Sequence, residues 1–227
     1  MSIFNINNRS ESWRISRQFI LGGYGLSNKL ANKVVSNVGQ ELSGEVELEL
    51  FWTGFRDYCH SQSITLENKS LLNEVGIAFE KNFSTLFEQV ESFNKRNTVK
   101  LRIDSSKHNY RLNNQSLCKL VKNLYHTEID IVISTGNSLL VGEVKSEVSF
   151  NANSEYVLVH QLIRQYVMAT ILVHLLNING QNITQITPFV IAEKNVSRSA
   201  QVRFMIDSGW LHQSNIFDWS VLEEKVS

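Results

Sequence analysis

"TEIDIVISTGNSLLVGEVKSE" (residues 127–147) consists of two apolar runs on either side of Gly136 and Asn137. A glycine–asparagine pair between two such runs is typical of a two-residue β-hairpin turn. A turn at this position places Asp130 directly opposite Glu143, and the Cβ atoms of opposed residues are about 5 Å apart. The stretch therefore predicts a hairpin that holds two carboxylates against each other.

The charged residues of this hairpin share one face. Lys145 lies two residues beyond Glu143, and side chains alternate across a strand, so Lys145 projects to the same side. Two like charges across a strand pair destabilise it, and a divalent cation bound by carboxylate oxygens offsets the repulsion. The pattern predicts a metal site, and the alternative is a set of solvated charges on an exposed strand. The opposite face is apolar and comprises Ile129, Ile131, Ile133, Leu140, Gly142 and Val144.

The composition excludes several classes of protein. The 227 residues are 42% hydrophobic and 19% charged, which indicates a folded core rather than disorder. No apolar run approaches the ~20 residues of a membrane span, and the N-terminal residues lack a secretory pattern. Cys59 and Cys118 form no metal-binding or disulfide pattern, so we expect free thiols and a cytoplasmic protein. The formal net charge is zero, so any contact with nucleic acid requires a local basic patch.

The hydrophobic periodicity predicts an α/β fold with a mixed central sheet flanked by helices. Near the N-terminus we expect helices around residues 26–38 and 49–61. Val75, Phe79, Phe83 and Phe87 repeat every four residues and predict one long helix over residues 66–91. The further elements are a strand at 98–104, a short helix at 115–125, the hairpin, a helix at 155–176, a strand at 186–194 and a helix at 197–210.

The hairpin, together with the helix that contains "GIAFEKNF", resembles the PD-(D/E)XK nuclease superfamily. The matching residues are Asp130, twelve intervening residues, and then Glu143, Val144 and Lys145. One departure is Ile129, where the superfamily often has proline. The resemblance covers roughly residues 66–210 and implies a restriction-endonuclease-like core of order α-β-β-β-α-β. We accordingly expect a helical N-terminal extension at 1–62 and the nuclease-like domain at 63–227.

The resemblance also implies a chemistry. Asp130, Glu143 and the backbone carbonyl of Val144 would bind Mg²⁺, with Mn²⁺ as a substitute. Lys145 would orient the attacking water and stabilise the transition state. A glutamate on the first core helix often completes the metal shell in this superfamily, and Glu80 fits that place; otherwise Glu80 is an ordinary residue of an amphipathic helix.

The helix after the hairpin carries a further candidate, Gln161. Gln161 and Gln165 lie one turn apart on the same helix face. In an exonuclease branch of the superfamily, a Gln-x-x-x-Tyr pattern on this helix lines the active site, but here Gln161 to Tyr166 is one residue longer. Gln161 is expected to reach the metal or the phosphate, and the alternative is a polar stripe on a helix that covers the sheet.

A basic segment precedes the hairpin. Residues 91–125 contain eight lysines and arginines against two acidic residues. We expect it to contact nucleic-acid phosphates, and the alternative is an ordinary solvated surface. The candidate residues are Lys95, Arg96, Lys100, Arg102, Lys107 and Arg111.

These features predict a metal-dependent endonuclease that hydrolyses DNA, of a restriction, defence or mobile-element type. Duplex DNA is the expected partner, and a homodimer is compatible with the sequence. One alternative is a nuclease-like fold that binds nucleic acid or assembles a complex without cutting. A second is an RNA endonuclease of the cap-snatching type, which typically adds an upstream metal-binding histidine; His60 is the one comparable residue before the motif helix.

Overall fold

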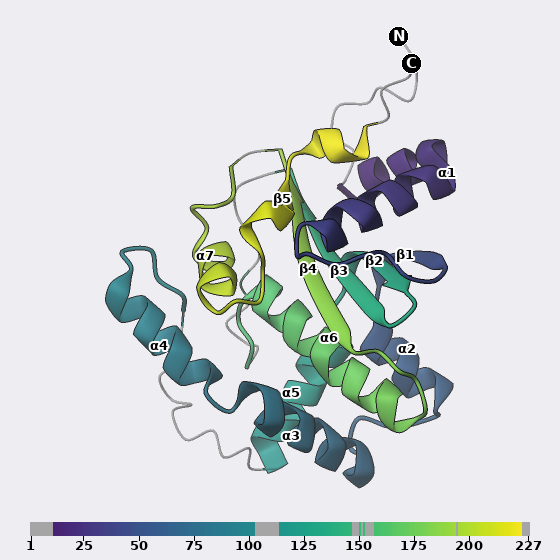
Figure 1. The fold of residues 1–227 in the computed structure, drawn as a ribbon. Coiled ribbons are helices and arrows are strands. Elements are labelled where there is room, and N and C mark those ends of the chain that lie inside the picture. The colour runs from purple at the N-terminus through teal and green to yellow at the C-terminus, as the bar shows by residue number, and fades with distance from the viewer. Residues whose placement is uncertain are drawn as a thin grey trace.

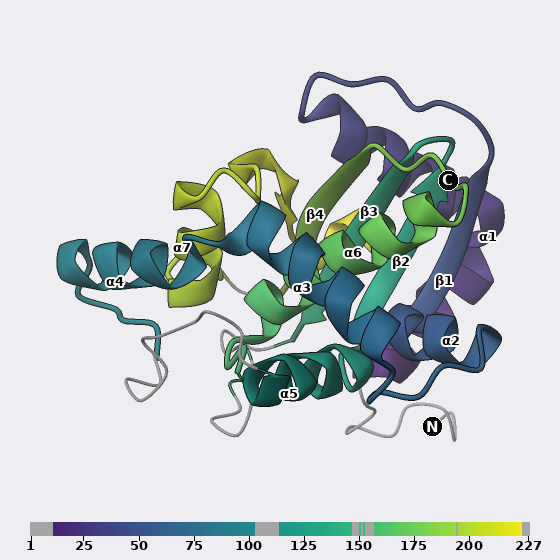
Figure 2. The ribbon, with the colours of Figure 1, turned by 90° about the horizontal axis from the view of Figure 1, so that it is seen from below.

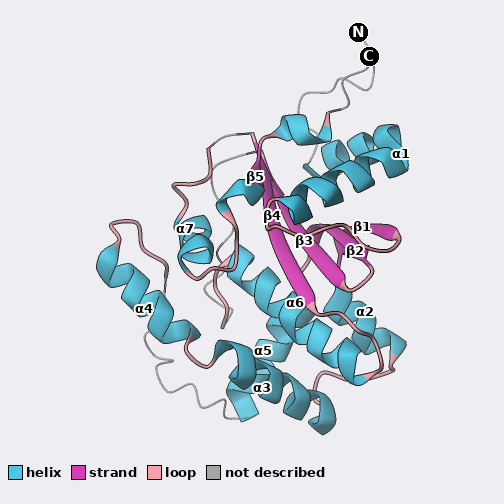
Figure 3. Cartoon of the chain, in the orientation of Figure 1, coloured by secondary structure: helices cyan, strands magenta, loops and turns pink. Residues whose placement is uncertain are grey.

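The computed structural model describes residues 11–102, 114–146, 150, 152, 157–193 and 195–223. Its centre is a mixed sheet of five strands in the order β1-β2-β3-β4-β5, with helices on both faces (Figures 1 and 3). This confirms the α/β class. The strands are β1 (Val46–Trp52), β2 (Ile129–Thr135), β3 (Ser138–Lys145), β4 (Gln185–Ala192) and β5 (Ile216–Phe217). The helices are α1 (Glu11–Ser36), α2 (Gly54–Ser61), α3 (Lys69–Phe83), α4 (Leu86–Arg96), α5 (Asn114–Tyr125), α6 (Gln161–Ile178) and α7 (Ala200–Asp207), with short 3₁₀ turns at Gln213–Asn215 and Trp219–Leu222.

The β2–β3 hairpin has the predicted register. Thr135 pairs with Ser138 and Ile131 pairs with Gly142 across the antiparallel ladder. Gly136 has a φ of 50°, a left-handed conformation that glycine adopts without steric cost. β1 pairs antiparallel to β2, whereas β4 and β5 continue the sheet parallel to β3 and β4. The two strands that carry the charged residues therefore lie in the interior of the sheet.

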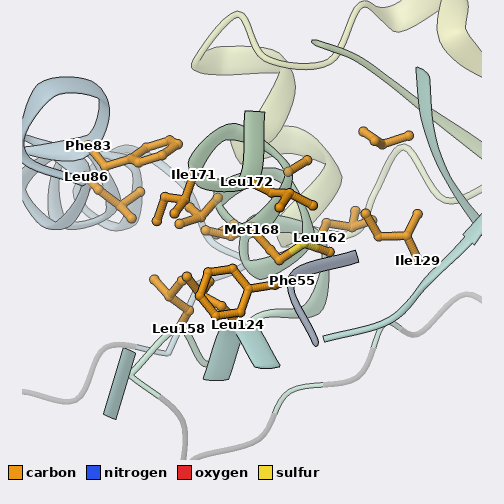
Figure 4. Close-up of a cluster of buried hydrophobic side chains, with 14 of the residues drawn as sticks. Phe55, Phe83, Leu86, Leu124, Ile129, Leu158, Leu162, Met168, Ile171 and Leu172 are labelled. Carbon is orange, nitrogen blue, oxygen red and sulfur yellow. The ribbon is translucent and has the colours of Figure 1, made fainter. Parts of the chain in front are cut away.

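The two faces of the sheet pack into separate cores. Val132, Leu139 and Val141 belong to the same core as α6, a helix buried on most sides. Figure 2 shows α6 lying across the sheet, and Figure 4 shows its residues Leu162, Met168 and Leu172 in this core. Four of the apolar residues predicted to share the other face, Ile131, Ile133, Leu140 and Val144, pack against α1. Ile129 was expected to join them, but it belongs to the core on the α6 side.

The helix predicted over residues 66–91 is two helices. α3 ends at Phe83 and α4 begins at Leu86, so the prediction of one continuous helix is wrong. The repeat of phenylalanines persists because their rings pack together across the break. The ring centroids of Phe79 and Phe87 are 6.5 Å apart, and those of Phe79 and Phe83 are 5.7 Å apart. The four-residue spacing reflects one shared apolar cluster, which two helices joined by a bend form as well as one straight helix does.

The strand expected at 98–104 is absent from residues 98–102, the part of it that the structure describes. Its place as the first antiparallel strand is taken by β1, inside the stretch expected to be a helical extension. The alternation of "VELELFW" explains β1, and the helix expected over 49–61 begins only at Gly54. α1 and β1 are thus part of the central sheet assembly, and residues 11–62 are not only helical.

The remaining elements agree with the sequence to within a few residues. α5, α6 and β4 occupy the expected places, although α6 begins at Gln161 rather than at residue 155. α7 has Ser199 at its N-cap position. Within the described ranges, no helix combines the length and the apolar character needed to cross a bilayer.

Candidate functional site

Asp130 and Glu143 meet where β2 and β3 diverge from their ladder. The last regular pair of the hairpin on this side is Ile131 with Gly142. One residue further out, the backbone N–H of Val144 donates a 2.8 Å hydrogen bond to Oδ2 of Asp130. The Asp130 side chain thereby takes the place of a backbone acceptor of β2 beside this residue of β3. Glu143 is 2% exposed and Asp130 is half-buried, so the two carboxylates lie at the border between core and solvent.

Three donors surround the Glu143 carboxylate. Lys145 Nζ lies 2.7 Å from Oε1. The amide of Gln161 donates to Oε1 and the amide of Gln165 donates to Oε2, each at a distance of 2.5 Å. Gln165 also donates to the carbonyl of Glu128 over 2.8 Å, which links α6 to the start of β2. The two glutamines of α6 therefore fix the orientation of both carboxylate oxygens.

Burial and the charges of neighbouring groups shift the pKa values of the residues in this cluster. Burial raises the pKa of Glu143 to about 8, and the nearby charge of Asp130 acts in the same direction. Burial also raises the pKa of Asp130. Burial lowers the pKa of Lys145, but the carboxylates around it outweigh burial and leave its pKa raised. The site thus holds a charged lysine against two carboxylates that resist being ionised together.

Glu11, at the start of α1, completes the charged cluster. Its Oε1 accepts hydrogen bonds from the backbone N–H of Ser146 and, over 2.7 Å, from the Ser146 hydroxyl. Its Oε2 lies 3.7 Å from Lys145 Nζ. The sequence pattern missed Glu11, because no local signal connects a residue of the first helix with a hairpin so distant in the chain.

The backbone at Lys145 is fixed from the other side. Its carbonyl accepts hydrogen bonds from the indole of Trp219 over 3.2 Å and from the N–H of Glu193 over 3.1 Å. Arg14 of α1 forms an ion pair with Glu193 and lies 4.3 Å above the Trp219 ring. Helix α1, the end of β4 and the C-terminal 3₁₀ turn therefore all converge on the last residue of β3.

Several predicted residues come together and others do not. Asp130, Glu143, Lys145 and Gln161 form the cluster, with Val144 contributing its backbone. Glu80 is exposed on α3 and lies outside it. Within the described ranges, no group of three or more histidines, cysteines or acidic residues is spaced to hold a metal ion, so Glu80 does not join the two carboxylates.

The basic residues lie on and after α4. Lys95 and Arg96 occupy its last turn, and Lys100 and Arg102 follow it; all four are exposed. The remaining two candidates, Lys107 and Arg111, lie outside the described residues. The backbone of Arg102 contacts His160, the residue that precedes Gln161. Residues 95–102 are the described part of the basic segment that carries these four cations, and the name is kept for them below. They end beside the helix that supports Glu143.

The cluster lies outside the hollow beside β1. A hollow of 730 Å³ runs along β1 and is lined by Glu47, Glu49 and Leu176, among others, but by none of the cluster residues. Comparisons of the chain with models of protein families, with curated proteins and with solved structures found no match.

Proposed function

We propose that the chain is a metal-dependent endonuclease that hydrolyses phosphodiester bonds in DNA. The observation that carries the proposal is the pair Asp130 and Glu143, opposed at the end of a hairpin, with Lys145 in contact with Glu143. Carboxylates that bind a divalent cation beside a lysine can act on a phosphate and on an attacking water.

The order of elements supports the proposal. α1, β1, β2, β3, α6 and β4 follow the order α-β-β-β-α-β expected of the PD-(D/E)XK superfamily, with α2 to α5 as an insertion after β1. The helix before the first strand is then α1 instead of α3. Glu11 is then the carboxylate that this helix brings to the cluster, with its Oε2 3.7 Å from Lys145 Nζ, but within the described residues it forms no metal-holding group of three with Asp130 and Glu143.

The residues fit a divalent cation. Asp130 and Glu143 present hard oxygen ligands, burial raises the pKa of both, and the charge of Asp130 raises the pKa of Glu143 further, a repulsion that a bound cation would relieve. We propose that they hold Mg²⁺ or Mn²⁺ with the carbonyl of Val144, and that the ion supplies Lewis-acid chemistry when bound. Gln161 and Gln165 hold Glu143 in one orientation, and Lys145 provides a positive charge beside the reacting phosphate.

Binding of nucleic acid without cleavage is the less favoured function. A buried ion pair is often no more stabilising than apolar side chains of similar volume, because both charges lose their hydration. Lys145 and Glu143 are 8% and 2% exposed, so this cost applies to both. A role of Lys145 and Glu143 in acting on a substrate would account for this costly buried pair.

The test is incubation of the purified protein with supercoiled plasmid, linear DNA and RNA, each with Mg²⁺, Mn²⁺ or EDTA. We expect nicking or linearisation of the plasmid with either metal and none with EDTA. Cleavage of RNA alone would instead support the cap-snatching type. Binding of DNA without cleavage of any substrate would support the non-enzymatic alternative and overturn the proposal.

A further inference from the structure

The end of the basic segment has no regular secondary structure, yet side chains from α4 and from the N-cap of α6 bond its backbone, and a side chain of α7 bonds the side chain of Asn97. The first is Asn94 of α4. Its Nδ2 donates to the carbonyl of Leu101, and its Oδ1 accepts from the N–H of the same residue, both over 2.8 Å. This pair of hydrogen bonds replaces the backbone partner that a strand would supply.

The second and third contacts come from α7 and from the start of α6. Arg203 of α7 donates to Oδ1 of Asn97 over 2.6 Å, and α4 and α7 also meet through Phe93 and Phe204, whose ring centroids are 5.7 Å apart. The N–H of Arg102 donates to Nε2 of His160 over 2.9 Å. His160 is 8% exposed, so the histidine side of this contact is buried although Arg102 is exposed.

The cations that this backbone carries are free of ion pairs within the described ranges. No described carboxylate lies within 4.0 Å of Lys95, Arg96, Lys100 or Arg102, and all four side chains are exposed. Chain segments without secondary structure that are held by a rigid scaffold commonly carry binding residues. Fixing such a segment in advance reduces the entropy lost when a ligand binds.

The fixed backbone also connects the cations to the catalytic cluster. His160 is the N-cap residue of α6 and immediately precedes Gln161, whose amide donates to Glu143. Adjacent residues therefore make the contact to Arg102 and the contact to Glu143. A polyanion bound along the basic segment would therefore extend towards the N-terminal end of α6, where Gln161 donates to Glu143.

We propose that Asn94, Arg203 and His160 are positioning residues that hold the basic segment as a guide for the phosphodiester backbone of the substrate. The inference rests on the proposed function for the identity of the ligand. It assigns roles to three residues that do not themselves contact substrate. They act through Lys100 and Arg102, because Asn94 and His160 bond the backbone of Leu101 and Arg102 while Arg203 bonds the side chain of Asn97.

The experiment measures binding without cleavage. A short labelled DNA duplex is titrated with Asp130→Asn protein in EDTA over a range of salt concentrations, with and without Asn94→Ala or His160→Ala. We expect each added substitution to weaken binding about tenfold and to lower the log–log salt slope by at least about 0.9, the value of one phosphate contact. His160→Gln should restore most of the slope, because its amide can accept from Arg102 N–H.

Asn82→Ala is the matched control, since Asn82 lies on the neighbouring α3 and donates to the carbonyl of Ala78 in its own helix. It should leave the slope unchanged. If His160→Ala fails to fold, Asn94→Ala tests the same guide from the other side. An unchanged slope in the folded Asn94→Ala protein, or an equal loss in Asn82→Ala, would overturn the inference.

Cleavage by Asn94→Ala protein that retains Asp130 separates this inference from the proposed function. The guide predicts a raised KM with kcat changed less than about threefold, because a positioning residue acts on binding. Protein that cuts DNA with an unaltered KM would refute the guide and leave the nuclease standing. Protein whose salt slope falls as expected but which never cuts would refute the nuclease and leave the guide standing.

Discussion

Lys145 is the residue whose chemical role can be separated best from its structural one. Its ammonium group contacts Glu143 and lies near Glu11, and its proposed role is to act on the water and the transition state. Lys145→Ala should reduce cleavage by about 10²-fold or more, the usual effect of removing one electrostatic group from an active site. DNA affinity should change little.

The measurement is plasmid nicking at saturating protein, together with DNA binding in EDTA. Lys29→Ala, which removes an exposed lysine of α1, is the control and should cut normally. Undiminished nicking by Lys145→Ala would remove the catalytic assignment.

His160 predicts a dependence of stability on pH. Burial lowers the pKa of His160 from 6.5 to about 4, so the unfolded state binds a proton more readily than the folded state between these values. The free energy of unfolding therefore falls as the pH drops from about 6.5 to about 4, with an upper limit on the order of 3 kcal/mol. Urea denaturation of the wild type and of His160→Gln, compared over this range, measures the difference. Parallel curves for the two proteins would show that His160 titrates normally.

At the scale of an element, β3 depends on the absence of a side chain at Gly142. A Cβ atom built at this position would lie 2.1 Å from Cζ of Phe189, which is 1% exposed in the neighbouring strand β4. Gly142→Ala should therefore destabilise the protein by about 1–3 kcal/mol through overpacking.

Gly25→Ala is the matched control for this substitution. A Cβ atom at Gly25, inside α1, has no neighbour within 4 Å among the described residues, and alanine favours a helix by up to about 1 kcal/mol. Urea denaturation of both variants should show opposite signs. A neutral Gly142→Ala would mean that Phe189 can move aside at no cost.

At the scale of the whole molecule, the proposed metal site predicts that metal binding is coupled to folding. Removing one of two opposed charges with Asp130→Asn should raise the melting temperature in EDTA. In the wild type, Mn²⁺ at a hundredfold excess over its dissociation constant should stabilise by about 2.7 kcal/mol, or roughly 5–10 °C. Asp130→Asn should gain little from the metal.

Thermal unfolding of both proteins in EDTA and across a Mn²⁺ titration makes this comparison. Asp57→Asn is a suitable control, because Asp57 is an exposed residue of α2 that accepts a hydrogen bond from Thr53. An equal metal-induced shift in wild type and Asp130→Asn would show that Asp130 is not a ligand.

Local patterns in the sequence were sufficient to predict the hairpin, its register and the meeting of Asp130 with Glu143. The period of a strand and the geometry of a two-residue turn involve only neighbouring residues, so the chain needs no tertiary information to specify them. The same holds for α5, α6 and β4, whose apolar patterns are local.

Tertiary structure alone decided which distant residues complete the site. Glu11 reaches Ser146, 135 residues further along the chain, because α1 packs against one face of the sheet. Residues 98–102 alternate like a strand, yet the neighbouring strand position belongs to β1, and the side chains of Asn94 and His160 bond the backbone of Leu101 and Arg102 instead. Periodicity records which side of a segment is apolar, whereas the partner of that side depends on the packing of the whole chain.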